Sequence, residues 1–256
     1  MDIKLFFLGT GTSQGVPMLG CSCNVCKSSD PRDKRLRTSV IVRFKNKNIL
    51  IDSGPDFRYQ MLRSNFRTVD AILFTHQHRD HTAGLDDLRA VYYLNKKPIS
   101  MYAESRVFDY IKTEFSYMFG PNYPGQPKFD MNNISNHSFS IFGIEILPIR
   151  AMHHKLPVLG FKIGGLTYIT DANYISESEK KKFLGTDILI LNSLQIEKHI
   201  SHYNLEDSLS LIEEIKPRKA YLTHIGHKMG LHSEVQKKLP TNVHLAYDNL
   251  CIQTKY

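Results

Sequence analysis

The chain has 256 residues, of which 41% are hydrophobic and 23% are charged, and this composition excludes an intrinsically disordered protein. No apolar run approaches the roughly 20 residues of a membrane span, and Met1 to Leu8 run into a glycine turn instead of a signal-peptide cleavage region, so we expect a cytoplasmic protein without a membrane partner. The net charge of +8 favours anionic partners such as phosphate esters or nucleic acid, although an ordinary basic surface explains it equally well.

The first predicted strand, Ile3 to Leu8, leads into a glycine-rich turn at residues 9–15. This turn lacks the third glycine and the opening helix of a dinucleotide-binding fingerprint, so we expect close packing there instead. Three of the four cysteines follow within six residues, at Cys21, Cys23 and Cys26. Disulfides between such close cysteines are strained and are rare in chains without an export signal, so a zinc-binding thiolate loop at residues 21–26 is the better explanation.

A closed zinc site needs a fourth ligand, and the chain offers two candidates. Cys251 lies in the apolar stretch 250–252 and is better explained as a small buried side chain. His227 stands three residues after His224 and completes a structural site of three thiolates and one imidazole. We therefore predict one structural zinc on Cys21, Cys23, Cys26 and His227.

A predicted hairpin of Thr38 to Phe44 with Ile49 to Ile51 ends at Asp52. Asp52 is explained equally well as a turn residue or as the acceptor of a hydrogen bond from a metal-bound histidine. Farther along, the apolar run Ala71 to Phe74 predicts a buried strand that ends in a ligand-dense loop. Within six residues this loop carries His76, His78, Asp80 and His81. Such a dense cluster predicts metal binding and favours two ions over one.

Helical spacing follows at Phe57 to Asn65, Gly84 to Leu94 and Ser105 to Phe119, with a short strand at Ile99 to Tyr102. Asp86 and Asp87 favour the dipole of the second helix and are not expected to be ligands. Residues 120–138 lack periodicity and are rich in Pro, Gly and Asn, which predicts a loop of the kind that often serves as a lid or a partner-binding segment.

The second half of the chain contains two predicted hairpins and three covering helices. The hairpins pair Phe139 to Ile141 with Ile144 to Ile149, and Leu159 to Ile163 with Leu166 to Thr170. Helices are expected at Ser176 to Leu184, Asn204 to Ile215 and Ser233 to Leu239. No linker separates the two halves, so we predict a single domain over residues 1–256.

Three apolar strands end in a threonine that is followed by a potential ligand. These pairs are Thr75-His76, Thr170-Asp171 and Thr223-His224. Side chains at strand ends project into one crevice in layered α/β proteins, so we expect these three ligands to meet although they are far apart in the sequence.

The order of these motifs resembles the hydrolytic branch of the metallo-β-lactamase superfamily over essentially the whole chain. The glycine turn, the CxCxxC and HxHxDH motifs, Thr170-Asp171 and residues 223–227 (THIGH) are similar in particular to PhnP-like phosphodiesterases. The resemblance implies an α/β fold, the αββα sandwich of two central mixed sheets flanked by helices. It also implies hydrolysis of a small phosphodiester, notably a ribosyl cyclic phosphate.

The resemblance further implies roles for individual residues. One divalent ion, manganese or zinc, would be bound by His76, His78 and His153, and a second by Asp80, His81 and His224, with Asp171 bridging the two. His153 is preferred to His154 because it matches the motif position. Asp80 and His202 would be catalytic, with His202 near the leaving-group oxygen, and Lys155 and His202 would contact the substrate. As a residue that flanks a helix, His202 also has an ordinary surface explanation.

The main alternative is a ribonuclease Z-like RNA-processing endonuclease, which resembles this chain in the same metal ligands and would use a basic surface for nucleic acid. The cysteine site and the lack of an evident inserted arm rich in basic and glycine residues argue against it. A redox di-iron protein would usually carry Glu in place of His78, and a non-enzymatic binding protein would lack a ligand. We therefore expect a small phosphodiester as partner, with nucleic acid less favoured and homodimerisation left open.

Overall fold

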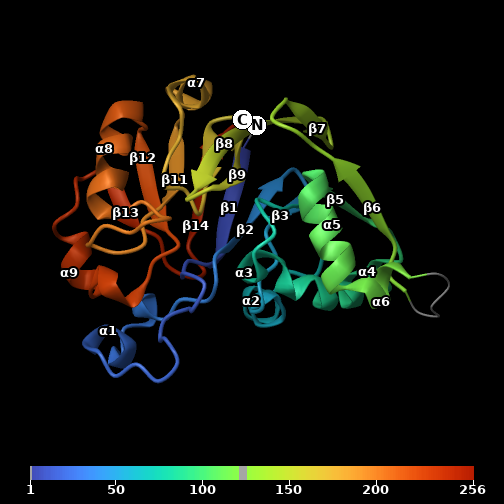
Figure 1. Ribbon diagram of the computed structural model, residues 1–256, viewed down its shortest axis with the longest axis horizontal. Coiled ribbons are helices and arrows are strands. Elements are labelled where there is room, and N and C mark those ends of the chain that lie inside the picture. Colours follow the sequence, from blue (N-terminus) through green and yellow to red (C-terminus); the bar gives the residue numbers. More distant parts are fainter. Residues whose placement is uncertain (1, 121–125) are drawn as a thin grey trace.

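The computed structural model describes residues 2–120 and 126–256, in which two seven-stranded sheets form the centre of the molecule (Figure 1). The first sheet contains β1 (Asp2–Gly9), β2 (Ser39–Phe44), β3 (Lys47–Ile51), β4 (Ala71–Leu73), β5 (Ile99–Ala103), β6 (Phe129–Asn133) and β14 (Cys251–Lys255). The second contains β7 (Phe139–Ile141), β8 (Ile144–His153), β9 (Leu156–Ile163), β10 (Leu166–Ile169), β11 (Ile188–Asn192), β12 (Lys219–Thr223) and β13 (Val243–Leu245).

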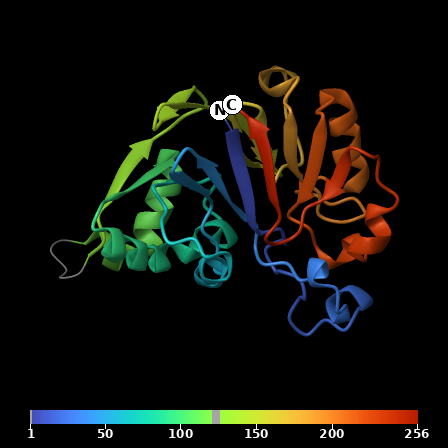
Figure 2. The same cartoon turned by 180° about the vertical axis from the view of Figure 1, so that it is seen from behind.

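Both sheets are mixed. The first has the order β14-β1-β2-β3-β4-β5-β6 and is parallel from β3 to β6, whereas β1 is antiparallel to both of its neighbours. The second has the order β13-β12-β11-β10-β9-β8-β7 and is parallel from β10 to β13. The N- and C-terminal strands β1 and β14 therefore lie side by side (Figure 2). Parallel strands present their carboxyl ends at one edge, where sites commonly form.

Helices cover the outer face of each sheet (Figure 1). The first sheet is covered by α2 (Phe57–Ser64), α4 (Leu88–Asn95) and α5 (Ser105–Glu114), and the second by α8 (Leu205–Ile215) and α9 (His232–Gln236). Shorter elements are α1 (Asn24–Lys27), α3 (Arg79–Thr82), α6 (Ser116–Phe119), α7 (Glu177–Lys180), η1 (Pro31–Asp33), η2 (Ala83–Asp87), η3 (Lys181–Phe183) and η4 (His227–Met229). None of the helices in the described ranges is long and apolar enough to cross a membrane.

Three apolar clusters hold the four layers together: one lies between the two sheets, and one lies between each sheet and its helices. Successive side chains of a strand point to opposite faces, so Leu73 packs between the sheets while Ile72 packs against the helices of the first sheet. In the same way Ile190 faces the space between the sheets and Leu191 faces the helices of the second sheet. Strands buried on both faces read as continuous apolar runs. The predicted αββα sandwich is confirmed.

Some elements differ from the sequence-based prediction. Residues 120–138 are not one loop, because β6 lies within them and pairs in parallel with β5; residues 121–125 of the expected loop lie outside the described part of the chain. β6 is short and largely exposed, and its only apolar residues, Phe129 and Met131, did not distinguish it from the surrounding sequence rich in Pro, Gly and Asn. The helices expected from 84, 105 and 176 are each divided into shorter segments. The strand β11 was not predicted at all.

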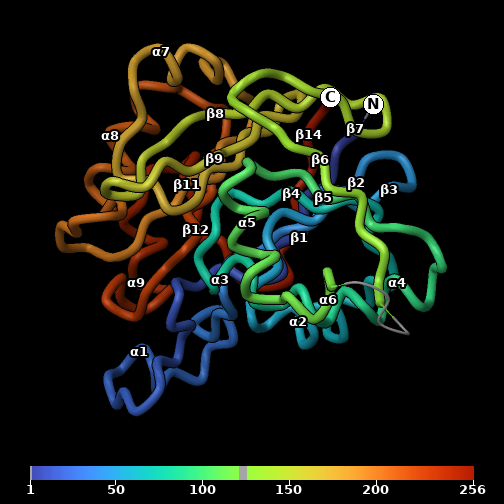
Figure 3. Tube along the Cα trace, turned by 45° about the vertical axis from the view of Figure 1, so that its right-hand side comes forward, coloured from blue at the N-terminus to red at the C-terminus, as the bar shows by residue number. Residues whose placement is uncertain are grey.

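The prediction that Cys251 is buried is wrong. Cys251 is exposed on β14, whose side chains alternate between solvent and core, and the neighbouring Ile252 takes the buried position. An apolar triplet therefore did not indicate which of its residues faces inward. Cys251 on β14 is also separate from the other three cysteines. These lie on the loop around α1, which projects from the body of the molecule (Figure 3).

Candidate metal centres and active site

The candidate ligands gather where strands of both sheets end. Asp52 follows β3, Asp171 follows β10 and His224 follows β12, and each has a positive φ, of 62°, 56° and 55° respectively. Such backbone angles are uncommon for residues with a side chain, and they concentrate at functional sites because the strain must be held by the surrounding structure. Three strand ends thus share the same unusual turn at one location.

The first ligand group consists of His76, His78 and His153, whose potential ligand atoms lie within 4.8 Å of one another. His153 Nδ1 donates to the carbonyl oxygen of Ser201 at 2.8 Å. Because a carbonyl only accepts, this bond leaves the lone pair on the other ring nitrogen, as a metal ligand requires. The structure therefore brings His153 into the cluster, whereas His154 is exposed on the turn that follows.

The second group consists of Asp80, His81, Asp171 and His224. The two carboxylate oxygens of Asp171 face different partners: Oδ1 lies 3.1 Å from His224 Nε2 and Oδ2 lies 3.1 Å from His81 Nε2. Asp80 Oδ2 is 3.2 Å from the same nitrogen of His81. This contact between His81 and Asp171 joins the loop after β4 of the first sheet to the end of β10 in the second.

Asp52 supports both groups from behind. His81 Nδ1 donates to Asp52 Oδ2 at 2.7 Å, and the backbone N–H and hydroxyl of Thr75 donate to Asp52 at 2.8 Å each. The Thr75 hydroxyl in turn accepts from His76 Nδ1 at 3.0 Å. Asp52 is fully buried. Of the two explanations left open by the sequence, the hydrogen bond to a candidate ligand is the one that the structure shows, and it extends to His76 through Thr75.

The donor atoms of these two groups fit divalent cations. Nε2 of His76, His81 and His224 is buried without a hydrogen-bond partner among the described residues. Burial holds the pKa of His76 well below its ordinary value; burial alone would raise the pKa of Asp171, but His224 and His81 hold it well below the usual range. Buried ring nitrogens without a partner and an ionised carboxylate that converge in one space would be costly without a cation, and nitrogen with oxygen donors suits zinc and manganese.

His202 lies beside both groups. Its ring centroid is 4.5 Å from that of His153 and 4.8 Å from that of His224, and its Nδ1 is 3.8 Å from Asp171 Oδ1. His202 is buried, so its explanation as an ordinary surface residue is wrong. Burial and the neighbouring His224 lower the pKa of His202 to about 3. It is close enough to His153 and Asp171 to act as a ligand as well as a proton donor.

Lys155 is exposed on the turn between β8 and β9, two residues beyond His153. Its side chain is exposed to solvent. Its expected contact with substrate stays a prediction.

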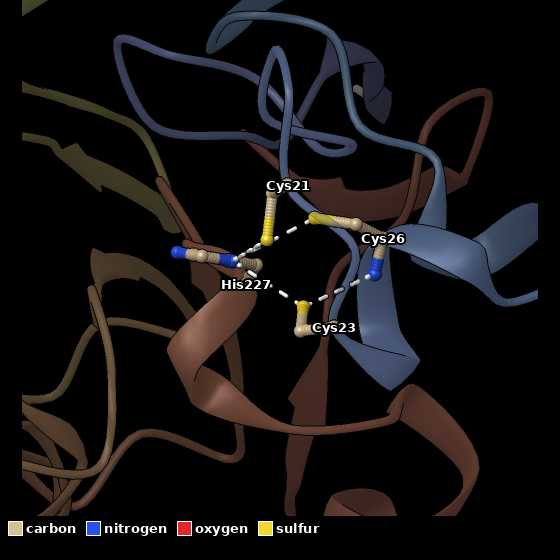
Figure 4. A group of neighbouring side chains, drawn as sticks. All are labelled: Cys21, Cys23, Cys26 and His227. Atoms are coloured by element: carbon tan, nitrogen blue, oxygen red, sulfur yellow. Dashed lines mark hydrogen bonds between the residues drawn. The ribbon is translucent and has the colours of Figure 1, made fainter.

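Cys21, Cys23, Cys26 and His227 form a separate group (Figure 4). The Sγ atoms of the three cysteines lie 3.2, 3.4 and 3.6 Å from His227 Nδ1. Tetrahedral zinc with Zn–S bonds of about 2.3 Å and Zn–N bonds of about 2.0 Å requires S–N separations of about 3.5 Å. The backbone N–H of Cys26 lowers the pKa of Cys23 to about 6, which favours the thiolate form that binds metals. The four residues thus fit a closed zinc site.

Several supporting residues were not found from the sequence. Thr170 Oγ1 donates to Asp171 Oδ2 at 2.6 Å, and Asn192 at the end of β11 bonds both the N–H and the C=O of Ala172. Arg106 donates to the side chain of Gln77, which lies between His76 and His78, at 2.9 Å. The threonine before each ligand was the one available signal, whereas Arg106 and Asn192 carry no local motif.

Comparisons with known proteins agree with this geometry. The family model of the beta-lactamase superfamily domain matches residues 47–225. A solved structure described as a new diphosphatase from the PhnP family is 36% identical, with a TM-score of 0.94, and covers 99% of this chain and 98% of that chain. A relative named octanoyltransferase, from Porphyromonas gingivalis, is 39% identical over 252 residues, but this chain spans only about half of its length (51%). A ribonuclease Z from Clostridium kluyveri is 40% identical over 65 residues, which are 25% of this chain and 22% of that protein.

Proposed function

Because this chain belongs to the metallo-β-lactamase superfamily as a PhnP-like, metal-dependent hydrolase, we propose that it is a phosphodiesterase that acts on a small substrate such as a ribosyl cyclic phosphate. The similarity to a PhnP-family diphosphatase over nearly the whole of both chains supports hydrolysis at phosphorus. The ribonuclease Z relatives either match a short part of the chain, as the Clostridium kluyveri protein does over 25% of it, or match more of it at lower identity, as the Lachnospira eligens protein does with 28% over 64%, so RNA processing is the weaker alternative.

The position of Asp171 is the observation that carries the proposal. Its two oxygens face two different histidines, while three further histidines converge on the other side, which suits a pair of divalent ions with Asp171 between them. We propose zinc or manganese in both positions and zinc in the cysteine site. Bound there, the active-site ions would lower the pKa of a water molecule and neutralise charge on phosphoryl oxygens.

His202 is proposed to hold the proton that the departing oxygen takes. Its Nδ1 is buried beside Asp171, so Nε2 is the nitrogen left to face a substrate. Burial disfavours the protonated ring in the free protein, and an anionic phosphate next to the imidazole favours it. Substrate binding therefore places the proton on His202 when it is needed. Asp80, proposed as a further catalytic residue, has its Oδ2 3.2 Å from His81 Nε2 and 3.7 Å from His224 Nε2, where it would share an ion with them.

Lys155 is proposed to meet the phosphate from the rim. Its ammonium is a flexible point charge next to His153, which suits attraction of an anion better than fixed orientation. The contribution of such an exposed charge is expected to be small.

The test is turnover by protein loaded with manganese or with zinc. Three substrates are compared: bis(4-nitrophenyl) phosphate, a ribosyl cyclic phosphate and a precursor transfer RNA. We expect the first two to be hydrolysed, and Asp171→Ala to lose at least about 10³-fold in rate, since it removes a shared ligand. Asp109→Ala on the exposed side of α5 is the matched control. Cleavage of the RNA alone would support the ribonuclease alternative, and no phosphodiester turnover in fully loaded protein would overturn the proposal.

A further inference from the structure

Arg106, in the first turn of α5, joins the two sheets beside the first ligand group. Its Nη1 donates to the side-chain oxygen of Gln77 at 2.9 Å, on the loop that carries two of the three histidines. Its Nη2 donates to the carbonyl oxygen of Pro157 on β9, which pairs with Met152, the residue before His153 on β8. One side chain thus contacts both the loop after β4 and the hairpin that carries the third histidine.

The guanidinium of Arg106 is held in place by Glu104. Nε and Nη2 of Arg106 donate to Glu104 Oε2 at 3.2 and 2.8 Å. Arg150 on β8 also donates to this carboxylate, with Nη1 2.9 Å from Oε2. Burial alone would raise the pKa of Glu104, but Arg150 and Arg106 hold it below its ordinary value. Glu104 is therefore an ionised acceptor that fixes the orientation of the planar donor fork of Arg106.

The start of the ligand loop is tied to β9 at two points. Leu159 N–H donates to the carbonyl oxygen of Thr75 at 3.1 Å. Two residues earlier on the same strand, Pro157 accepts from Arg106, which also holds Gln77. The first histidine of the loop lies between these two ties. Together they set how far the loop of the first sheet lies from the β8–β9 hairpin of the second.

His78 is the candidate ligand whose position depends most on this arrangement. The rings of His76 and His153 each have a hydrogen-bond partner, a hydroxyl and a backbone carbonyl respectively. Within residues 2–120 and 126–256, His78 forms its hydrogen bonds through its backbone and none through its ring. The place of this ring, with its centroid 5.1 Å from that of His153, is therefore set by the backbone next to Gln77, which Arg106 holds.

We propose that Arg106 is a positioning residue for one of the two active-site ions, because through Gln77 and Pro157 it sets the separation between His78 and His153. The inference rests on the pair of ions proposed above but not on the identity of the substrate. The hydrogen bonds of Arg106 to described residues reach none of the second ligand group. Loss of Arg106 should therefore weaken one ion and spare the other.

The experiment is titration of metal-free protein with manganese, followed calorimetrically, with bound metal counted by elemental analysis and no substrate present. Arg106→Met removes the guanidinium and keeps an apolar stem of similar length. We expect it to lower the affinity for one of the two active-site ions about 10-fold, as for loss of a contact behind a metal ligand, and to leave the other at the wild-type value.

Arg150→Met is the matched control. It also removes an arginine that is paired with Glu104, but the hydrogen bonds of the Arg150 side chain to described residues reach only that carboxylate and neither Gln77 nor Pro157. A general loss of stability from the broken ion pair would appear in both variants, in the melting temperature of the metal-free protein. We expect Arg150→Met to bind both ions with wild-type affinity.

Two more variants identify the weakened ion and the contact that matters. His78→Ala removes a ligand of the first group only, so adding Arg106→Met to it should not change the affinity for the ion that remains. Gln77→Met removes the acceptor of Arg106 and leaves the ion pair with Glu104 in place. It should weaken the same ion as Arg106→Met, and it carries the test if Arg106→Met does not fold.

Unchanged affinities in folded Arg106→Met, an equal loss for both ions, or the same selective loss in Arg150→Met would overturn this inference and leave the proposed function standing. If Arg106→Met does not fold, wild-type affinities in Gln77→Met would overturn it. A wild type that binds no divalent ion beyond the zinc of the cysteine site would overturn the proposed function itself.

Discussion

Replacement of Asp52 by Asn should weaken metal binding at both ligand groups, although Asp52 is not a candidate ligand. The carboxylate accepts from three donors: Thr75 N–H on Oδ1, and the Thr75 hydroxyl and His81 Nδ1–H on Oδ2. Asn offers one oxygen and one NH₂ group. If the NH₂ group of Asn takes the place of Oδ1, it faces the N–H of Thr75; if it takes the place of Oδ2, it faces the N–H of His81. The imidazole of His81 can relieve this conflict by moving its proton to Nε2, which removes the lone pair that a metal needs.

The expected magnitude follows from this geometry. Loss of a partner behind a metal-bound histidine typically reduces metal affinity 10- to 100-fold, which corresponds to about 1.4 to 2.8 kcal/mol. Thr75→Val removes only the relay to His76, since the methyl group replaces the hydroxyl that accepts from His76 Nδ1. We therefore expect Thr75→Val to weaken the group with His76, and Asp52→Asn to weaken both groups.

The assay is titration of metal-free protein with manganese or zinc, followed calorimetrically, with elemental analysis of the dialysed protein. Asp109→Asn, an exposed substitution on α5, is the control for the loss of one negative charge. Wild-type affinity for both ions in a correctly folded Asp52→Asn protein would refute the argument that Asp52 sets the tautomer of His81.

Three further outcomes are expected. Cys23→Ser should lower the metal content from three ions per chain to two and should lower the melting temperature. A chelator should remove the two active-site ions before the zinc of the cysteine site, because a closed site has no exchangeable water position. His202→Ala should cost about 10² to 10⁴ in rate on an alkyl phosphodiester and far less on a nitrophenyl diester, with unchanged metal content; loss of an ion would instead identify His202 as a ligand. Burial and Arg35 lower the pKa of His232 to about 4, so the unfolded chain binds more protons below pH 6.5, and stability is lost as pH falls from 6.5 to 4. For His232→Gln, whose amide oxygen can still accept from Arg35, we expect a melting temperature that changes less between pH 6.5 and pH 4 than that of the wild type. The difference corresponds to about 1 to 3 kcal/mol in the free energy of unfolding.

Most of the candidate ligand cluster could be predicted from the sequence because its members have a local signature, whereas His153 was preferred to His154 only from the family resemblance. The HxHxDH loop is dense, and Asp171 and His224 each follow an apolar strand and a threonine. The carboxyl ends of strands meet at one edge in a layered fold, so the topology brings these ligands together although they are far apart in the sequence. The buried strands could be predicted for the same reason, since their runs of apolar residues are continuous.

The supporting contacts could not be predicted, because they join residues that have no signature of their own. Arg106 on α5 reaches Gln77 across 29 positions, and Ser201 accepts from His153 across 48. A cavity of about 290 Å³ beside His202 is lined by three segments that are far apart in the sequence, within residues 12–14, 194–202 and 226–228, and no local pattern joins them. β6 was hidden for another reason: a short edge strand with only two apolar residues, Phe129 and Met131, resembles a loop in sequence.

The cysteine site and the candidate active site are connected through one short segment after β12. His224 belongs to the ligand cluster, and His227, three residues later, faces the three sulfurs. Between them, Ile225 N–H donates to Thr10 C=O at 2.8 Å and Ile225 C=O accepts from Thr12 N–H at 3.1 Å. A zinc ion held by His227 and the three sulfurs would therefore limit the positions open to His224, three residues earlier. Because His224 sits in a strained backbone conformation, with φ of 55°, some external restraint must hold it there. We propose that the cysteine loop, when its four candidate ligands hold zinc, is one such restraint.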